Sequence, residues 1–363
     1  MKLNQANRSS FTSRIFFFNL FRGKIDCQKI VMSTTMSTFD QTNASNYVNL
    51  ADERLGAQTL SCSDEFFAPS SRLLNSAAAV FHPGRYDEHG QYMEGWETRR
   101  KRVAGHDWCI IKLGLAGKIV GVDIDTSHFT GNYPVAASLD ACDVKEGDNP
   151  DHWQEILPAV TLGPSAHHFH GIQSDGYWTH VRLNIYPDGG IARLRIYGIV
   201  QLPEYKFKEE LDLLALENGG RAIAASNEHY GNPWALLRPG RGINMGDGWE
   251  TRRRRVPGNE WCILALGKRG RISRIVLDTA HYKGNYPDRC VIQAADVTID
   301  HNKSIITQSM FWQTLLLEQK LTMDAIHTFE NEQINDLGPI THVRVNIIPD
   351  GGLSRVRLFG RVE

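Results

Sequence analysis

The stretch that decides the fold is Gly95-Trp96-Glu97-Thr98-Arg99-Arg100, because it occurs again as Gly248-Trp249-Glu250-Thr251-Arg252-Arg253. The match extends past both copies: Trp108-Cys109-Ile110 recurs as Trp261-Cys262-Ile263 at the same offset, 248 − 95 = 153 residues. A long segment that repeats at a fixed offset without a gap marks a duplicated structural unit. The chain is therefore a tandem duplication of one domain.

The stretch is unusual because it leads into consecutive cations, Arg99, Arg100, Lys101 and Arg102. Successive side chains of a strand point to opposite faces of its sheet, so inside a sandwich strand this run would place unpaired cations in the core at high cost. We therefore expect it at a strand end or in a loop, or paired with carboxylates such as Glu97. A solvated charged edge is one interpretation, but the recurrence beside a tryptophan favours a binding role.

Size and charge limit the classes of partner. The 363 residues suffice for two domains with cores of their own, and the net charge of −1 gives no overall attraction for nucleic acid or an anionic membrane, so we expect neither. No segment approaches the length of a membrane span. The six cysteines lack the paired spacing of a metal site, and Cys109 and Cys262 lie in apolar runs, which indicates reduced thiols of a cytoplasmic protein.

Residues 1–46 differ from the rest of the chain and are predicted to lie outside the fold as an N-terminal extension. The residues before Asp26 are basic with no acidic residue, which is typical of a presequence for mitochondria or another organelle. An upstream extension of little meaning is the other interpretation, because Met32 or Met36 could serve as the start. We assign residues 47–202 to the first repeat, 203–222 to a linker and 223–363 to the second repeat.

Short strand-like runs separated by turn residues fill each repeat. The run from Ile119 to Asp125 alternates with period two, as a half-buried strand does. Pro187-Asp188-Gly189-Gly190 joins two further runs as a hairpin, in which Asp188, like Asp350 in the second copy, is a turn former. Pro203 to Glu217 is compatible with a helix. The pattern predicts an all-β fold of two tandem β-sandwich domains joined by a short helical linker.

The same loop pattern follows the alternating strand in both repeats. It reads Asp125-Thr126-Ser127-His128-Phe129-Thr130-Gly131-Asn132-Tyr133-Pro134 and then Asp278-Thr279-Ala280-His281-Tyr282-Lys283-Gly284-Asn285-Tyr286-Pro287. An Asp, a His and an Asn are thus placed identically at a strand end. His167, His168 and His170 form a further cluster that could suggest a metal, but we predict a loop there because no equivalent is evident in the second repeat.

The paired Gly-Trp-Glu-Thr-Arg-Arg stretches, these loops and the Pro-Asp-Gly-Gly hairpins resemble the allantoicase family over about residues 47–363. The resemblance implies two jelly-roll domains of the galactose-binding-like kind. It also implies a hydrolase of purine degradation that converts allantoate and water to (S)-ureidoglycolate and urea. Allantoate is then the expected small-molecule substrate.

The implied reaction suggests roles for the repeated residues. Allantoate is a small carboxylate with two ureido groups on one carbon, so its hydrolysis calls for a cation, a general acid for the leaving nitrogen and a base for water. The candidate catalytic residues are Glu97, His128, His180 and Asp125, with Glu250, His281, His342 and Asp278. The candidate substrate ligands are Arg99, Arg100, Asn132 and Arg193, with Arg252, Arg253, Asn285 and Arg355. No cofactor is predicted; a divalent metal stays open, although the ligand spacing does not support one.

Two other interpretations remain, a non-catalytic tandem discoidin-like binding module and an inactive homologue of the enzyme. The thiols and the charged loop residues argue against the first, and the candidate residues retained in both halves argue against the second. Asp64 becomes Asn227 and Phe129 becomes Tyr282 between the repeats, so each repeat could hold a site, one could be silent, or both could line an interface. A homo-oligomer is compatible with exposed sandwich faces.

Overall fold

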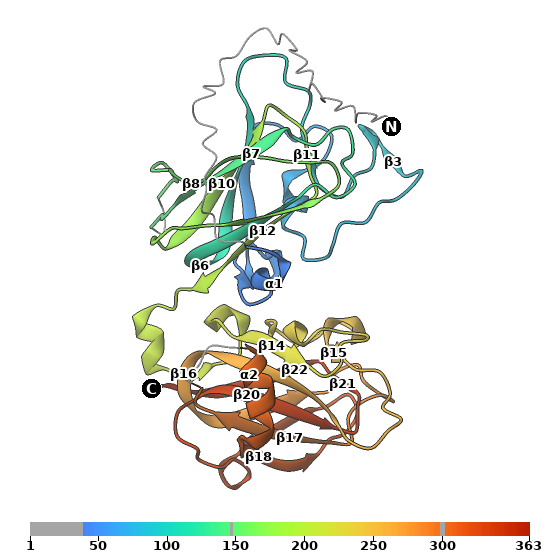
Figure 1. Cartoon of the computed structure of the whole chain (residues 1–363), viewed down its shortest axis with the longest axis vertical. Coiled ribbons are helices and arrows are strands. Elements are labelled where there is room, and N and C mark those ends of the chain that lie inside the picture. The colour runs from blue at the N-terminus through green and yellow to red at the C-terminus, as the bar shows by residue number, and fades with distance from the viewer. Residues whose placement is uncertain (1–38, 146–147, 298–301) are drawn as a thin grey trace, which may run out of the picture.

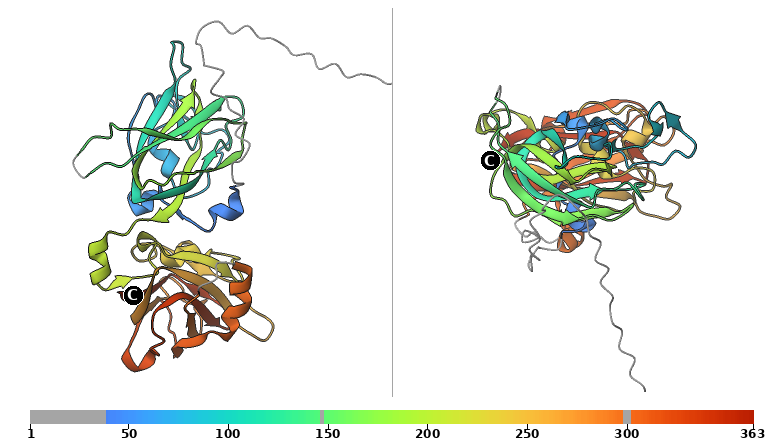
Figure 2. Two further views of the ribbon diagram at one scale, coloured as in Figure 1. Left: turned by 60° about the vertical axis from the view of Figure 1, so that its left-hand side comes forward. Right: turned by 90° about the horizontal axis from the view of Figure 1, so that it is seen from above.

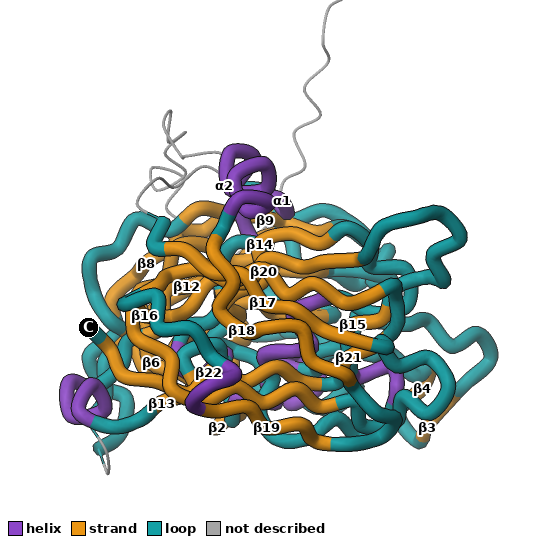
Figure 3. The backbone as a smooth tube through the Cα atoms, turned by 90° about the horizontal axis from the view of Figure 1, so that it is seen from below, coloured by secondary structure: helices purple, strands orange, loops and turns teal. Residues whose placement is uncertain are grey.

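The structure of the protein is a computed structural model that describes residues 39–145, 148–297 and 302–363. These residues form two halves built from strands, one below the other in Figure 1. The short helix α1 (Gln41–Ala44) lies between the halves in this view and in the left view of Figure 2. Strands run through the whole molecule in Figure 3, with only short helical segments among them. The predicted all-β fold of two tandem domains is confirmed.

The two halves contain the same series of elements. The first has strands β1 (Val48–Asn49), β2 (Gln58–Cys62), β3 (Tyr86–Asp87), β4 (Gly90–Gln91), β5 (Trp96–Glu97), β6 (Asp107–Asp125), β7 (Ala136–Cys142), β8 (Gln154–Thr161), β9 (His167–Gly171), β10 (Trp178–Tyr186), β11 (Gly190–Ile191) and β12 (Arg193–Val200), with 3-10 helices η2 (Glu53–Leu55) and η3 (Ser70–Leu74). The helix η4 (Glu204–Lys208) follows.

The second half has strands β13 (Leu211–Asp212), β14 (Arg221–Ala225), β15 (Trp249–Glu250), β16 (Glu260–Asp278), β17 (Arg289–Ala295), β18 (Gln313–Lys320), β19 (Ile326–Glu330), β20 (Ile340–Ile348), β21 (Gly352–Leu353) and β22 (Arg355–Val362). Its helices are η5 (Leu216–Asn218), η6 (Pro233–Leu237), η7 (Met245–Asp247), α2 (Asn302–Gln308), η8 (Ser309–Phe311) and η9 (Asn331–Gln333).

One long strand in each half joins the two layers of the sandwich. The first part of β6 pairs with β2 and β10, and its last part pairs with β9 and β12. One layer is therefore β2, β6, β10, β7 and β8, and the other is β9, β6, β12 and β1. In the second half β16 has the same partners in the same order, namely β14, β20, β19 and β22.

The core forms from the inward side chains of these strands, as their period of two requires. Ile111 of β6, Leu139 of β7 and Leu183 of β10 are fully buried. The repeated tryptophans belong to the same core. Trp96 and Trp249 are both 0% exposed, and their indole N–H groups donate to backbone carbonyls at 2.8 and 2.9 Å, so each contributes a large apolar surface without an unsatisfied donor.

The cationic run lies in a loop, as expected for consecutive cations that would otherwise face both sides of a sheet. β5 pairs with β11 and ends at Glu97, so that Arg99 and Arg100 are exposed. The backbone N–H of Lys101 donates to Asp188 Oδ2 at 2.8 Å, and Asp350 accepts the equivalent bond at 2.8 Å in the second half. Both aspartates thus hold the cationic loop against the Pro-Asp-Gly-Gly turn to which they belong.

The helical linker is present as η4, but the helix does not continue to Glu217 as the sequence pattern predicts. Instead, β13 pairs with β22 of the second half, and Leu213 and Leu214 are 0% exposed. These leucines lie in the turn after β13 and are buried in the core, and this burial outweighs the local helical preference. The second half therefore contains residues from Leu211 onward, before the predicted start at residue 223.

Part of the predicted extension also belongs to the fold. The ring of Phe39 lies 6.4 Å from that of Tyr47 and 6.0 Å from that of Tyr197 on β12. Arg221 of the second half donates to the carbonyl of Asn46 at 3.1 Å. Residues 39–46 thus contact both halves. The predictions for residues 1–38, including the presequence, lie outside the described residues.

Candidate active site

A pocket of about 680 Å³ in the first half brings together three of the predicted residues, Glu97, His128 and Asn132. Glu97 comes from the end of β5, and the other two come from the loop that follows β6. The remaining lining residues are Phe67, Phe81, His89, Gly90, Gln91, Met93, Thr130 and Ser165. A concave pocket with apolar walls and a few converging polar groups is typical of a small-molecule site.

Burial changes the acid–base behaviour of Glu97. Removal from water raises the pKa of its carboxyl above the ordinary 4.5, and the nearby Asp87 adds to the rise. The side-chain amide of Asn132 donates to Glu97 Oε1 at 2.6 Å, which opposes the rise and fixes the carboxyl in position. Glu250 and Asn285 make the equivalent short contact in the second half. A carboxyl with a raised pKa keeps its proton for donation at a higher pH than an exposed one.

The Pro-Asp-Gly-Gly turn holds this asparagine loop in place. Gly190 N–H donates to the carbonyl of Asn132 at 2.8 Å. Gly189 has φ of 143°, and a Cβ atom there would lie 2.7 Å from the same carbonyl, so no larger residue fits without displacing the loop. Gly351 has φ of 137°, and a Cβ atom there would likewise lie 2.7 Å from the carbonyl oxygen of Asn285. The hairpin and the loop therefore position Asn132 and Asn285.

The histidines of the repeated loops adopt a backbone conformation that is rare outside glycine. His128 has φ of 70° and His281 has φ of 72°. Such residues are uncommon and concentrate at functional sites. Nε2 of His128 lies 3.1 Å from the carbonyl of Ala79, and Nε2 of His281 lies 2.7 Å from that of Gly242. A carbonyl only accepts, so Nε2 carries the proton and Nδ1 of the neutral ring remains a proton acceptor.

The exposed arginines differ in what they bind. Arg99 donates through Nε and Nη2 to Asp64 Oδ1 at 2.9 and 2.7 Å. In the second half Asn227 replaces that aspartate, and Arg252 has no carboxylate at ion-pair distance among the described residues. Within the same ranges Arg100 and Arg253 also have no ion-pair partner, and both are exposed. Arg100, Arg252 and Arg253 are therefore available for an anion.

The predicted ligands Arg193 and Arg355 are occupied by the fold. They are 2% and 3% exposed, and each donates to several backbone carbonyls and to one carboxylate, Glu94 at 3.0 Å or Asp247 at 2.7 Å. Each guanidinium thus fastens the loop before β5 or β15 to the sandwich. Their positions do not support a direct contact with a substrate.

Asp125 and Asp278 act on the histidine loop through its backbone. Asp125 Oδ1 accepts from Ser127 N–H at 2.7 Å, and Asp278 Oδ1 accepts from Ala280 N–H at 2.8 Å. Both are nearly fully buried. Neither carboxylate is hydrogen-bonded to the histidine three residues later. Each aspartate thus shapes the turn that presents the histidine, as an Asx turn does.

His180 and His342 lie at the other end of the sandwich from the pocket. The carbonyl of Tyr186, at the end of β10, accepts from Val135 in the pocket loop, and His180 is six residues earlier on this strand, about 20 Å away at ~3.3 Å per residue. Its Nδ1 contacts Thr179, as Nδ1 of His342 contacts Thr341, and the ring of His342 also lies 6.2 Å from that of Trp312. The structure does not bring these histidines together with Glu97 or Glu250.

Comparison with known proteins shows to which family this chain belongs. The model of the allantoicase repeat matches residues 48–201 and 211–363. The chain belongs to the allantoicase family. It is 57% identical over 321 residues to a probable allantoicase 1 of Burkholderia mallei, covering 87% of this chain and 95% of the relative, and 55% identical over 322 residues to a probable allantoicase of Acinetobacter baylyi, covering 88% and 96%.

Solved structures agree with this family. The crystal structure of allantoicase from Saccharomyces cerevisiae matches with a TM-score of 0.75 and 33% identity, covering 90% of this chain and 100% of that one. A second structure, described as allantoicase, matches with a TM-score of 0.74 and 34% identity over 89% of this chain and 95% of that one. The arrangement of two stacked sandwiches is thus shared with solved allantoicases.

Several pocket residues of this allantoicase-family chain escape sequence reasoning. Phe81, His89 and Gln91 belong to or adjoin the β3–β4 hairpin, which lies in the stretch whose length differs between the two allantoicase repeats. The prediction depended on repetition, so residues without a counterpart could not be found. The abundance of Gly, Tyr, Asp and His between residues 85 and 94 was the signal available.

The histidine cluster of residues 167–170 forms a strand and not the predicted loop. β9 pairs with the end of β6, and β19 pairs with β16 in the same register, which makes His168 equivalent to His327. Nε2 of His168 accepts from Gly163 N–H at 2.8 Å, and Nε2 of His327 accepts from Thr322 N–H at 2.9 Å. His168 of the cluster thus has a counterpart, His327, which the sequence does not reveal because the offset between the repeats changes before this point. Both histidines stabilise the turn before their strand.

Within residues 39–145, 148–297 and 302–363, no group of three or more His, Cys, Asp or Glu side chains is arranged to hold a metal ion. No helix in the same ranges combines the length and hydropathy needed to cross a bilayer.

Proposed function

We propose that this chain is an allantoicase, which hydrolyses allantoate to ureidoglycolate and urea in purine degradation. The observation that carries the proposal is the carboxyl–amide pair of Glu97 and Asn132, set beside His128 in a pocket and repeated as Glu250, Asn285 and His281. Membership of the allantoicase family, on both repeats, supports the same reaction.

The reaction breaks the bond between the central carbon of allantoate and one ureido nitrogen. The oxygen of water becomes the hydroxyl of ureidoglycolate, and the departing nitrogen takes up a proton to leave as urea. A ureido nitrogen is a poor leaving group until it is protonated, so a general acid lowers the barrier most at this atom. A proton must also leave the attacking water.

We assign the general acid to Glu97, because burial raises the pKa of its carboxyl and Asn132 fixes one of its oxygens. We assign the base to His128, whose Nε2–H is held by a backbone carbonyl so that the neutral ring offers Nδ1 to a proton. Arg100, which has no ion-pair partner among the described residues, is the proposed ligand of the substrate carboxylate.

The test is urea release from allantoate by the full chain. Glu97→Gln keeps the size and the hydrogen bonding of the side chain but removes its proton, and we expect a loss of roughly 100-fold or more in kcat. Glu228→Gln is the matched control, since Glu228 also accepts from an asparagine, Asn232 at 2.6 Å, and burial also raises the pKa of its carboxyl. The control should retain activity.

The second repeat is tested in parallel with Glu250→Gln and His281→Ala beside His128→Ala. Loss in variants of both repeats would mean that each half contributes to a required site, and loss in one only would identify the working half. If the wild-type chain releases no urea, with or without an added divalent metal ion, the proposal fails and a binding function takes its place.

We also propose that the protein is cytoplasmic and self-associates. The five described cysteines are free thiols, which supports a reducing compartment. Val103 and Val256 occupy equivalent loops and are 75% and 65% exposed, which supports a contact with further copies of the chain. Sedimentation of the full chain would test the assembly, and a monomer at micromolar concentration would contradict it.

A further inference from the structure

One wall of the candidate active site comes from a segment that is longer in the first half than in the second. The buried guanidinium of each half binds both ends of this segment, which are Ala77 and Glu94 in the first half and Gly240 and Asp247 in the second. The ends are 94 − 77 = 17 positions apart in the first half and 247 − 240 = 7 in the second. The ten extra residues form the β3–β4 hairpin, whose β3 is labelled in Figure 1. Five of the eleven residues that line the pocket belong to this segment.

The hairpin is fixed to the sandwich by the residue that follows β4. The ring of Tyr92 contacts two guanidinium groups, that of Arg85 at 3.7 Å and that of Arg72 at 4.4 Å from the ring centroid. Arg72 belongs to η3 and also donates to the carbonyl of Met93 at 2.6 Å. The side chains of the hairpin are therefore held in position before a substrate arrives, as a precise binding site requires.

Gln91, the last residue of β4, has an amide group of fixed orientation. Its Nε2 donates to the backbone carbonyls of Arg85 at 2.8 Å and His82 at 3.3 Å. A carbonyl only accepts, so the nitrogen of the amide faces the hairpin and Oε1 lies on the opposite arm. The side chain is half-buried and lines the pocket. Within the described residues Oε1 accepts no hydrogen bond, and it is open to solvent.

A second amide oxygen beside the same pocket is also unoccupied. Nδ2 of Asn132 donates to Glu97 Oε1 at 2.6 Å, and Oδ1 on the other arm accepts no hydrogen bond in the part of the chain that the structure describes. Two neutral acceptors thus border the pocket. A ureido group is neutral and has N–H donors on both of its nitrogens, so it suits these oxygens, whereas a carboxylate offers them no proton.

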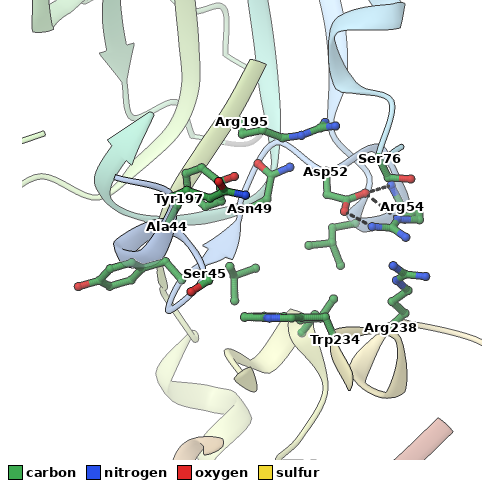
Figure 4. Close-up of a pocket in the computed structure, with 15 residues that line it drawn as sticks. Ala44, Ser45, Asn49, Asp52, Arg54, Ser76, Arg195, Tyr197, Trp234 and Arg238 are labelled. Carbon is green, nitrogen blue, oxygen red and sulfur yellow. Dashed lines mark hydrogen bonds and ion pairs between the residues drawn. The ribbon is translucent and has the colours of Figure 1, made fainter. Parts of the chain in front are cut away.

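The cavity between the two halves differs from this pocket. It has a volume of about 310 Å³, and Figure 4 shows residues of its lining. Arg54 donates to both carboxylate oxygens of Asp52 at 3.0 and 2.6 Å, and Arg238 binds Asp247 at 2.6 Å. These charged groups are paired within the protein. The open acceptors beside Glu97 therefore offer the better site for a ligand that donates hydrogen bonds.

We propose that Gln91 is a specificity-determining residue of the candidate active site, and that its Oε1 accepts a hydrogen bond from a ureido N–H of the substrate. This inference rests on the proposed function, which makes a ureido compound the substrate. In the second half, where the segment is shorter, the thioether of Met245 lies beside the equivalent asparagine, at 4.0 Å from Nδ2 of Asn285 to Sδ. Recognition of the ureido group by the hairpin thus belongs to the first half.

The test compares the binding of two probes to the full chain by calorimetric titration. Hydantoate carries one ureido group and one carboxylate. Levulinate has the same shape and charge, with CH₂ and CH₃ in place of the NH and NH₂ of the ureido group. The ratio of the two dissociation constants therefore measures what the N–H donors contribute. We expect the wild type to bind hydantoate at least about fivefold more tightly than levulinate, the value of one neutral hydrogen bond.

Two substitutions separate the acceptor of Gln91 from its anchoring donors. Gln91→Lys keeps donors for the two carbonyls but removes the acceptor, so the preference for hydantoate should decrease about fivefold. Gln91→Glu keeps acceptor oxygens but removes the donors, and it should retain the preference. The added charge acts on both anionic probes alike and so cancels in the ratio. The control is Gln308→Lys, at an exposed residue of α2 outside the pocket, which should behave as the wild type does.

The proposal is overturned if the wild type does not bind hydantoate or does not distinguish the two probes, or if Gln91→Lys keeps the preference. It is also overturned if Gln91→Glu loses the preference, because the anchoring of the hairpin and not the acceptor would then decide it. Urea release is not a readout here. A chain that distinguishes the probes but releases no urea contradicts the proposed function alone, and one that releases urea with an unchanged preference in Gln91→Lys contradicts this inference alone.

Discussion

At the scale of the residue, burial changes what the carboxyl of Glu97 can do. A carboxyl whose pKa is raised in the folded state binds more protons there than in the unfolded chain at pH values above 4.5, its ordinary pKa. Its contribution to stability is therefore complete below pH 4.5 and is lost as the pH rises through the folded-state pKa.

The first prediction concerns pH. Glu97→Gln removes this titration, so we expect the Tm of the wild type, relative to the variant, to decrease as the pH rises above 4.5. The kcat for urea release by the wild type should also decrease with pH once Glu97 loses its proton. Thermal unfolding and initial rates across the pH range check both expectations. A Tm difference that is independent of pH would mean that Glu97 titrates normally.

The second prediction uses the one-residue difference between the repeats beside the exposed arginines. Asp64 neutralises Arg99, whereas Asn227 leaves Arg252 without a carboxylate among the described residues. If Arg252 holds the substrate carboxylate, Asn227→Asp supplies an internal competitor and should raise the KM for allantoate roughly tenfold, the value of one charged hydrogen bond, with a smaller effect on kcat. Asp64→Asn is the reciprocal control and should not raise the KM. An unchanged KM in Asn227→Asp would remove Arg252 from the site.

At the scale of the element, the turn between β10 and β11 positions the asparagine loop. The third prediction is that Gly189→Ala lowers the free energy of unfolding by about 1–3 kcal/mol, because of its φ and the close carbonyl of Asn132. Urea release by the folded variant should also decrease. Gly131→Ala, in the same loop, meets no atom within 4 Å and has no left-handed φ, so it should change neither quantity. Chemical denaturation and initial rates measure both.

The sequence predicted the elements that occur in both repeats and few of the others. Glu97, at the end of β5, meets His128 and Asn132, in the loop after β6, in one pocket, and repetition and strand periodicity indicated both of these strand ends. His180 was grouped with them for its chemistry, but its place along β10 depends on the register with β6 and β7, which the sequence does not reveal. The burial of Arg193 could not be predicted either, because its carbonyl partners Ala77 and Glu94 lie 116 and 99 residues earlier in the chain.

At the scale of the whole molecule, the second half begins within the segment that the sequence predicts as a linker. The fourth prediction follows from this boundary. Leu214→Ala should cost about 2–5 kcal/mol of unfolding free energy, as for any core leucine, because Leu214 is 0% exposed. Tyr205→Ala, in η4, should stay within about 0.5 kcal/mol, because Tyr205 is 64% exposed. Equal effects of the two substitutions in urea denaturation would contradict this boundary.

The long strands β6 and β16 have a consequence for how each half opens. Each is 19 residues long and is hydrogen-bonded in both layers of its sandwich. The layers of one half therefore cannot separate by a local fluctuation, because parting them breaks the ladder of a strand that both share. We expect amide hydrogens along the whole of β6 to exchange with deuterium at a single slow rate, set by complete unfolding of the half. Amide hydrogens of edge strands such as β8 should exchange sooner, so we expect local opening of this protein to be confined to its edge strands and loops.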